Sequence, residues 1–401
     1  MDIQELVRKL AKVTDSKIVL LVLDGLGGLP VGPQAKTELE MAKKPNMDKM
    51  AKAGVIGQAA PVARGITPGS GPGHLALFGY DPIKYLIGRG VLEALGIDFK
   101  LKPGDVAIRV NFCTVDDSGL ITDRRAGRIS TEVNAKLCEK LRKIKITGAE
   151  YFIDPVKEHR AALVFRAPGL GGRINDTDPQ VTGKPEEPMV AGDKESEKTK
   201  KLAEEFMKQA REILKKEHPA NMMLLRGFAC FTKYPSFDEI YKLKACAIAQ
   251  YPMYKGLARL VGMDVLEVGA EMEDLFKTLE SVWNKYDFFF VHVKKTDSAG
   301  EDGDWARKVE VIEKVDKFIP RVVKLKPEVF IITGDHSTPS KLAAHSFHPV
   351  PVLIATEFSR TDHNREFGER SCEAGGLGRF EMKYLMSLAM GYALKLDKYG
   401  A

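Results

Sequence analysis

Short apolar runs without alternation recur near both ends of the chain. We expect each run to form a strand buried on both faces, because a strand with one wet face alternates apolar and polar residues. The expected strands are 18–23, 55–59, 287–293, 329–333 and 350–355. Between them, patterns typical of helices cover 46–53, 271–286 and 305–325. Helices that alternate with buried strands predict an α/β fold with a largely parallel sheet sandwiched by helices.

The middle of the chain has a different pattern. Shorter strands are expected at 106–115, 120–123, 151–154 and 161–165, around a helix at 131–142. A loop rich in Gly, Pro, Asp and Lys (168–194) then leads to a charged helix at 195–216. We therefore expect a discontinuous domain made of residues 1–103 and 236–401, with a smaller α+β domain inserted at 104–235. The length of 401 residues also fits two domains better than one core.

Composition narrows the classes of function. The formal net charge is +6, and the basic residues are spread along the chain rather than clustered as in nucleic-acid-binding proteins. A small anionic substrate suits this bias better. The five cysteines are odd in number and form no CxxC pair, which indicates a reducing compartment. No signal-peptide pattern and no membrane-length apolar run is present, so we expect a cytoplasmic protein without membrane partners.

Acidic and imidazole side chains lie where the expected strands end, which is where open α/β sheets bind ligands. They are Asp24 after 18–23, Asp297 and Glu301 after 287–293, Asp335 and His336 after 329–333, and His345 just before 350–355. A single Asp there is more often a cap or turn residue, and a single His near a strand is usually a hydrogen-bonded, half-buried side chain. Together they offer ligands for two divalent ions, whose charge would offset the repulsion between the carboxylates.

Ser70 lies in a glycine-rich segment, 67–74, that precedes a helix-like apolar stretch. Glycines allow close approach of the backbone to a ligand, and a helix that begins there would favour a phosphate. The alternative is that Ser70 only caps this helix. The segment is not a P-loop, because no Gly-Lys-Ser/Thr follows, and its spacing fits the G-x-S-x-G motif poorly.

In order and spacing, these segments resemble the archaeal-type 2,3-bisphosphoglycerate-independent phosphoglycerate mutases of the alkaline phosphatase superfamily. The resemblance rests on Asp-Gly-Leu-Gly at 24–27, Thr-Pro-Gly-Ser-Gly-Pro-Gly-His at 67–74, Lys-Thr-Asp at 295–297, Gly-Asp-His-Ser-Thr-Pro at 334–339 and His-Ser-x-x-Pro-Val-Pro at 345–351. It extends to 249–263 and to Asp-Arg-Arg-Ala-Gly-Arg at 123–128, and so covers nearly the whole chain. It implies an alkaline-phosphatase-like catalytic domain.

The resemblance also implies a role for each residue. Ser70 would be the nucleophile that becomes phosphoserine. One metal would be held by Asp24, Ser70, Asp335 and His336, and the other by a set that includes Asp297 and His345. Relatives carry His where this chain has Glu301, so Glu301, Asp302 or His348 is left to complete the second site. Such ligands permit Mn, Zn, Co or Mg, and the family requires no 2,3-bisphosphoglycerate.

The chemistry calls for further basic groups. A serine hydroxyl is a weak nucleophile until a cation lowers its pKa, and a mutase must then keep glycerate bound and exclude water. The candidates are Arg124, Arg125 and Lys255 as catalytic groups, and Arg128, His159, Arg160 and Arg226 as substrate-binding groups. All except Lys255 lie in the expected insert, which would act as a substrate clamp. The alternative for any one arginine is that it is merely solvated.

The expected function is interconversion of 3-phosphoglycerate and 2-phosphoglycerate in glycolysis or gluconeogenesis, without a nucleic-acid partner. One alternative is a metal-dependent phosphohydrolase, or a mutase for another small phosphate ester, which the product would distinguish. Another is a non-catalytic binding protein on the same fold, which loss of Ser70 or of several ligands would indicate. Neither the oligomeric state nor the metal follows from the sequence.

Overall fold

The computed structural model describes residues 2–32, 35–363 and 366–400. Two compact units make up the chain: a larger one from Met1–Leu86 and Pro235–Ala401, and a smaller one from Ile87–Tyr234. The smaller unit begins ahead of the expected residue 104, because helix α5 (Arg89–Gly96) packs on four of its strands. No helix in the described ranges is both long and apolar enough to cross a bilayer.

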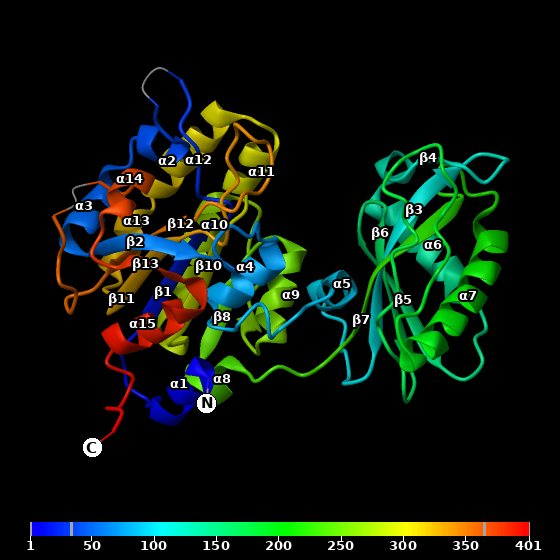
Figure 1. The fold of residues 1–401 in the computed structure, drawn as a ribbon, viewed down its shortest axis with the longest axis horizontal. Coiled ribbons are helices and arrows are strands. Elements are labelled where there is room, and N and C mark those ends of the chain that lie inside the picture. The colour runs from blue at the N-terminus through cyan, green and yellow to red at the C-terminus, as the bar shows by residue number, and fades with distance from the viewer. Residues whose placement is uncertain (1, 33–34, 364–365, 401) are drawn as a thin grey trace. The chain divides into compact units, whose positions relative to one another are not determined.

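The larger unit is built on an eight-stranded sheet (Figure 1). In sheet order, its strands are β13 (Gly378–Glu381), β2 (Val55–Ala60), β12 (Val350–Ala355), β11 (Val329–Thr333), β1 (Ile18–Leu23), β10 (Phe288–Val293), β8 (Ala245–Ile248) and β9 (Asp264–Val265). β1 lies between β11 and β10 and is parallel to both. All six residues of β1 are buried, as expected for a strand covered on both faces.

One strand of this sheet runs against the others. β12 is antiparallel to both of its neighbours, β11 and β2, whereas the other pairings in the described sheet are parallel. The largely parallel sheet expected from the sequence is therefore confirmed. Because β12 is reversed, the residues before it lie at the same sheet edge as the residues that follow β1, β10 and β11. This edge is where the candidate metal ligands were expected.

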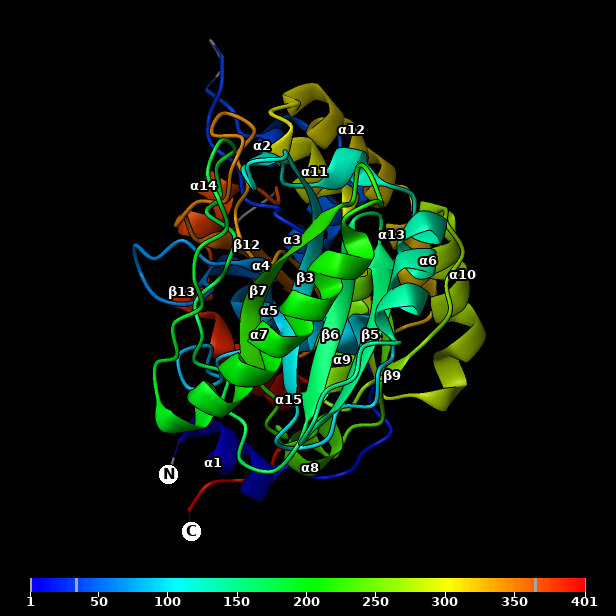
Figure 2. The same ribbon diagram turned by 90° about the vertical axis from the view of Figure 1, so that its right-hand side faces the viewer.

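Helices flank this sheet on both sides (Figures 1 and 2). One group, packed together, consists of α3 (Pro45–Ala53), α10 (Met272–Val282), α12 (Trp305–Asp316) and α13 (Ile319–Lys324). A second group consists of α4 (Ser70–Leu77), α9 (Pro252–Leu260) and α15 (Leu385–Tyr392). The remaining helices of the described part of this unit are α1 (Ile3–Leu10), α2 (Glu38–Met41), α8 (Phe237–Tyr241), α11 (Lys295–Glu301) and α14 (Glu369–Glu373).

The single helix expected over 305–325 is wrong. Helix α12 ends at Asp316 and α13 begins at Ile319, with Pro320 in the first turn of α13. Proline lacks the backbone N–H that a helix interior needs, and its ring clashes with the preceding turn. The helix expected over 271–286 is also shorter, because α10 ends at Val282 and a 3-10 turn, η2 (Trp283–Lys285), follows.

The smaller unit has the expected α+β architecture. Its antiparallel sheet centres on β3 (Val106–Val115), which pairs with β6 (Arg160–Arg166), β7 (Met222–Cys230) and β4 (Ile121–Asp123), while β5 (Glu150–Lys157) pairs with β6. Helices α6 (Thr131–Leu141) and α7 (Lys194–Leu214) pack together and contact β5 and β7. The sequence analysis did not anticipate β7. The core includes Phe112, Phe165 and Phe206.

Candidate functional site

Two groups of side chains in the larger unit could each hold a metal ion. We call Asp24, Asp335 and His336 the first metal group, and Asp297, His336 and His345 the second. Within each group, the three ligand atoms lie within 4.8 Å of one another. All except the half-buried His345 are buried. The ends of β1, β10 and β11 and the loop before the reversed β12 bring them together.

Unpartnered oxygen atoms show that the first metal group fits a cation. Neither carboxylate oxygen of Asp24 accepts a hydrogen bond, and Oδ2 of Asp335 accepts none either, although all three atoms are buried. The other oxygen of Asp335 accepts a hydrogen bond from the backbone N–H of Gly25, at 3.1 Å. Buried carboxylate oxygens without donors are costly unless a cation binds them. Carboxylate and imidazole ligands suit Mn, Zn, Co or Mg.

The ring of His336 is oriented by Thr338. The Thr338 hydroxyl donates its only proton to Oδ1 of Asp297, at 2.6 Å, so Nδ1 of His336 must be the donor in its 2.9 Å contact with the same hydroxyl. The lone pair then lies on Nε2, which is 3.1 Å from Asp335 and 3.4 Å from Asp24. Burial lowers the pKa of His336, which favours this neutral form. The geometry thus favours His336 as a ligand of the first group.

Ser70 is the first residue of α4 and follows Gly69 at the N-cap. The residue is half-buried, and the hydrogen bond of its side chain among the described residues joins Oγ to Nε2 of His336, at 3.2 Å, rather than to the backbone of α4. A Cβ added to Gly73 would lie only 2.4 Å from the carbonyl oxygen of Asp335, so glycine permits α4 to approach this loop. The interpretation of Ser70 as a helix cap is therefore wrong, and its hydroxyl faces the first metal group.

Glu301, the last residue of α11, lies beside the second metal group rather than within it. Its Oε1 atom is 3.8 Å from Nε2 of His345, and its side chain is 54% exposed. Burial and the charge of Asp297 raise the pKa of this carboxyl group. Glu301 is absent from both three-residue groups found in the described part of the chain.

The two other candidates for completing the second site have different partners. Asp302 forms an ion pair with Arg307, at 3.0 Å. Nδ1 of His348 lies 3.1 Å from the hydroxyl of Ser346. Of the three candidates, only Glu301 has a contact with the second metal group among the ion pairs of the described residues.

Lys294 is a charged neighbour of both metal groups that the sequence analysis did not assign. Its Nζ atom lies 3.3 Å from Oδ2 of Asp24 and donates a hydrogen bond to Oδ2 of Asp297. Burial alone would raise the pKa of Asp24, but neighbouring His292 and the charge of Lys294 hold it well below its ordinary value. Lys294 directly follows β10, so the rule that ligands bind at strand ends could have identified it.

A layer of aromatic side chains packs behind the first metal group. His74 lies 3.1 Å from Asp335, and Nε2 of His292 lies 3.3 Å from Asp24. The Tyr254 ring packs against both histidines, with ring centroids 4.6 Å from His74 and 3.8 Å from His292. The sequence analysis missed these three residues. Only His74 had a signal, because it is four residues after Ser70 and therefore on the same helix face.

Lys255 follows Tyr254 on α9. Its Nζ atom lies 3.7 Å from the carboxylate of Glu267, and its side chain is mostly buried. Among the ion pairs of the described residues, none joins Lys255 to a residue of either metal group. The catalytic role of Lys255 therefore stays a prediction.

A cavity of about 240 Å³ in the smaller unit is lined by cationic side chains. This arginine pocket is formed by Arg109, Asn111, Arg124, Arg125, Arg128, Glu158, His159, Arg160 and Arg226. It contains all six candidate residues of the insert. Arg109 and Asn111 were not predicted from the sequence, because they lie on β3 among apolar core residues and carry no local signal of function.

Two arginines of this pocket are held in place by Asp178, whose side chain is fully buried. Asp178 accepts two hydrogen bonds from Arg124, each 2.8 Å long, and lies 3.1 Å from Nη1 of Arg226. Asp176 adds a 3.1 Å hydrogen bond from Nε of Arg226. Burial alone would raise the pKa of Asp178, but the Arg124 hydrogen bonds and the charge of Arg226 keep it lowered. The loop at 168–194 thus orients the pocket.

His159 contributes no charge to the pocket at neutral pH. Burial, together with the charge of Arg160, lowers its pKa from 6.5 to about 4. The positive charge that attracts an anion is therefore supplied by the arginines.

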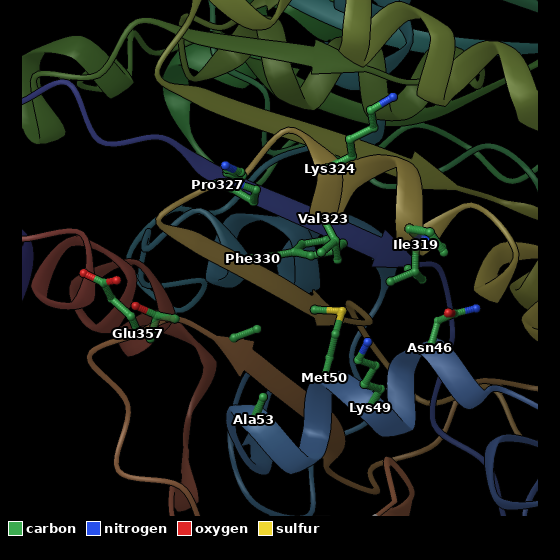
Figure 3. Close-up of a pocket in the computed structure, with 14 residues that line it drawn as sticks. Asn46, Lys49, Met50, Ala53, Ile319, Val323, Lys324, Pro327, Phe330 and Glu357 are labelled. Carbon is green, nitrogen blue, oxygen red and sulfur yellow. The ribbon is translucent and has the colours of Figure 1, made fainter.

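A further cavity, of about 650 Å³, lies elsewhere in the larger unit (Figure 3). Met50, Val323 and Phe330 point into it, whereas Lys324 points away. Its walls come from α3, α13, the start of β11 and the end of β12, which is the sheet edge opposite the metal groups. It contains no candidate metal ligand or nucleophile, so it is not the candidate active site.

Known proteins resemble this chain in sequence over its full length. The profile of the 2,3-bisphosphoglycerate-independent phosphoglycerate mutase family matches residues 51–221. Proteins from Thermotoga neapolitana and Deinococcus radiodurans, both named as probable mutases of this kind, are each 51% identical, over the full length of both chains.

A solved structure has the same fold. The cofactor-independent phosphoglycerate mutase of Thermoplasma acidophilum is 31% identical, with a TM-score of 0.73, and the match covers 94% of this chain and 100% of that one. The expected resemblance is thereby confirmed over nearly the whole length. The chain belongs to the family of 2,3-bisphosphoglycerate-independent phosphoglycerate mutases.

Proposed function

We propose that this chain interconverts 3-phosphoglycerate and 2-phosphoglycerate through a phosphoserine at Ser70, with two divalent cations and without 2,3-bisphosphoglycerate. The observation that carries the proposal is the 3.2 Å separation between Oγ of Ser70 and Nε2 of His336. It brings a hydroxyl group with no capping role against the three buried oxygen atoms of Asp24 and Asp335 that accept no hydrogen bond. A binding protein without catalytic activity has no need for this combination.

The reaction divides into two phosphoryl transfers. The Ser70 hydroxyl loses its proton as Oγ attacks phosphorus, the bond to the C3 oxygen of glycerate breaks, and that oxygen takes up a proton. The C2 hydroxyl then attacks the phosphoserine, loses its proton, and restores the Ser70 hydroxyl. Divalent cations bound by the two metal groups would supply Lewis-acid activation of the hydroxyl and charge neutralisation of the phosphoryl group.

The chain's own groups would orient these steps. The backbone N–H groups at the start of α4 favour a phosphoryl group on Ser70. Lys294, the charged neighbour of both metal groups, would stabilise the negative charge that the phosphoryl oxygens add.

The arginine pocket would bind the carboxylate of glycerate and keep it from leaving between the two transfers. Guanidinium groups match carboxylates with paired hydrogen bonds, and Asp178 orients Arg124 and Arg226 before substrate binds. Retention of glycerate is what distinguishes a mutase from a phosphohydrolase. We infer that this is the role of the smaller unit.

A coupled assay tests the proposal. Formation of 2-phosphoglycerate from 3-phosphoglycerate is measured without 2,3-bisphosphoglycerate, before and after chelation, and again after Mn²⁺ is restored. We expect activity that is lost on chelation and recovered with metal. Activity that survives full removal of metal would reject the metal-dependent route. Release of inorganic phosphate as the main product would favour a phosphohydrolase instead.

A further inference from the structure

Lys308, on α12, is a fully buried lysine close to the metal groups. A buried ammonium group is costly unless acceptors take up its hydrogens. Its Nζ atom donates to three backbone carbonyl oxygens: Gly25 at 2.9 Å, Gly27 at 3.0 Å and Thr338 at 2.8 Å. All three donors of the side chain are therefore used on the backbone.

These carbonyls belong to two different loops. Loop 24–28 follows β1 and begins with Asp24, and loop 334–340 follows β11 and includes Asp335 and His336. The backbone N–H of Thr338 also donates to the carbonyls of Gly25 and Gly27, at 3.2 and 3.1 Å. The ammonium group of Lys308 thus lies where the two loops that form the first metal group meet.

Loop 24–28 has little freedom to adjust. Gly25 has a φ of +64°, and a Cβ added there would lie 2.7 Å from Oδ1 of Asp297. The backbone N–H of Gly25 donates to Asp335, and its carbonyl oxygen accepts from Lys308. Both polar groups of this peptide backbone are therefore fixed. A shift of this carbonyl would move the adjoining Asp24.

Glu38, on α2, provides the counter-charge. Its side chain is fully buried, and Oε1 lies 3.9 Å from Nζ of Lys308. The same oxygen accepts hydrogen bonds from the backbone N–H of Ser340, at 2.9 Å, and from the Ser340 hydroxyl. Glu38 therefore balances the charge of Lys308 and fixes the far end of loop 334–340.

We propose that Lys308, with Glu38 as its counter-ion, is a positioning residue that sets the separation of loops 24–28 and 334–340, and thereby the affinity of the first metal group for a divalent cation. Without the ammonium group, the three buried carbonyl oxygens would lose the hydrogen bonds that Lys308 donates. Because these bonds join the two loops, the loops would then move apart. The inference rests on the proposed function only in requiring that the metal groups bind metal.

The test is a calorimetric titration of metal-free protein with Mn²⁺. Lys308→Met keeps the length of the side chain and removes its charge. We expect the Kd for Mn²⁺ to rise by about tenfold or more, as when groups that orient metal ligands are removed. The visible spectrum of bound Co²⁺, which reports ligand geometry, should also change.

Lys395→Met is the matched control. Lys395 is equally buried, and its Nζ atom donates to the carbonyl of Thr14, at 2.6 Å. Its replacement should lower the midpoint of thermal unfolding but leave Mn²⁺ binding and the Co²⁺ spectrum unchanged. If Lys308→Met binds Mn²⁺ as tightly as Lys395→Met, the inference is rejected.

A second variant covers the case in which Lys308→Met does not fold. Glu38→Gln keeps an oxygen for Ser340 and removes the counter-charge, so Mn²⁺ should bind more weakly than to Lys395→Met. Equal binding would overturn the inference. If the wild-type protein itself binds no Mn²⁺, the proposed two-metal function fails and this inference with it. If the wild type, Lys308→Met and Glu38→Gln all bind Mn²⁺ normally, this inference is rejected and the proposed two-metal function still stands.

Discussion

Oγ of Ser70 lies 3.2 Å from Nε2 of His336, although the two residues are 266 positions apart in the chain. The serine is the first residue of a helix, and the histidine belongs to the loop after a central strand of the sheet. The sequence around either residue alone does not distinguish a nucleophilic serine from one that caps a helix. Their contact does, because a capping serine turns its hydroxyl toward the backbone of its own helix.

Replacing Ser70 by alanine should abolish turnover without unfolding the protein. A nucleophile that carries the phosphoryl group has no substitute, so we expect the rate to fall on the order of 10⁴-fold or more. The measurement is the coupled mutase assay, together with phosphopeptide mapping of enzyme quenched with substrate. Ser130→Ala is the control: Ser130 does cap its helix, α6, and its loss should cost about 1 kcal/mol of stability and little activity. Phosphate on any other residue would contradict the assignment.

Glu301→Ala should weaken metal binding and turnover together, by about tenfold, if Glu301 completes the second metal group. Its contact with His345 and its exposed position suit a ligand that a cation draws inward. Glu301→His should restore part of both properties, since an imidazole can also bind these metals. Mn²⁺ stoichiometry and mutase rate are the readouts. Wild-type values in the alanine variant would assign Glu301 to the protein surface.

Replacing Arg124, Arg125 or Arg128 should change which product forms. If glycerate is bound more weakly, water can compete with it for the phosphoserine. Mutase turnover should therefore fall much more than phosphoserine formation. The measurement is the ratio of 2-phosphoglycerate to inorganic phosphate formed from 3-phosphoglycerate. Arg142→Gln is the control, because Arg142 pairs with Asp154 outside the pocket. A wild-type ratio in every single and combined variant would exclude retention of glycerate by these arginines.

Asp178→Asn should raise the KM for 3-phosphoglycerate by about tenfold. Hydrogen bonds to charged groups contribute about 1.5–3 kcal/mol each, and Asp178 supplies two to Arg124. Without them, Arg124 and Arg226 would have to be ordered by the substrate itself. Asp154→Asn, which breaks the ion pair with Arg142, provides the comparison. An unchanged KM in Asp178→Asn would mean that substrate binding does not depend on this carboxylate.

Acidification should destabilise the protein in part through His159. Its pKa is about 4 when folded and has an ordinary value of 6.5, so between these pH values the unfolded chain binds more protons than the folded one. The stability contributed by neutral His159 is therefore complete above pH 6.5 and is lost as the pH falls toward 4. His159→Asn should reduce the difference in urea midpoint between pH 7 and pH 5. An unchanged difference in His159→Asn would contradict this contribution.

The sequence was sufficient to predict the five neighbouring strands β2, β12, β11, β1 and β10 and the acids that follow β1, β10 and β11. It did not predict β13, β8 and β9, which lie outside these five. Ile18–Leu23 is apolar throughout, and an apolar run of that length has few alternatives to a buried strand. Asp24, Asp335 and His336 could then be placed at one edge, because parallel strands end on the same side. The direction of β12 could not be predicted, since strand polarity depends on its partners, β11 and β2.

Other parts of the site had no local signature. Lys308 lies in a helix with many charged residues and differs from its neighbours only in what surrounds it. The same is true of Asp178, which lies in a loop whose composition suggests solvent exposure. Such residues acquire their roles from hydrogen bonds between distant segments, and periodicity carries no information about these.

The division of the larger unit into two chain segments has a consequence for biosynthesis. β1 leaves the ribosome early, but its sheet partners β10 and β11 are made only after the whole smaller unit. The smaller unit is continuous in sequence, so it can fold first. During that interval β1 is an unpaired hydrophobic strand, the kind of segment that chaperones bind and that aggregates form around. Slowed translation after Tyr234 should therefore lower the yield of folded protein more than the same delay placed before β1.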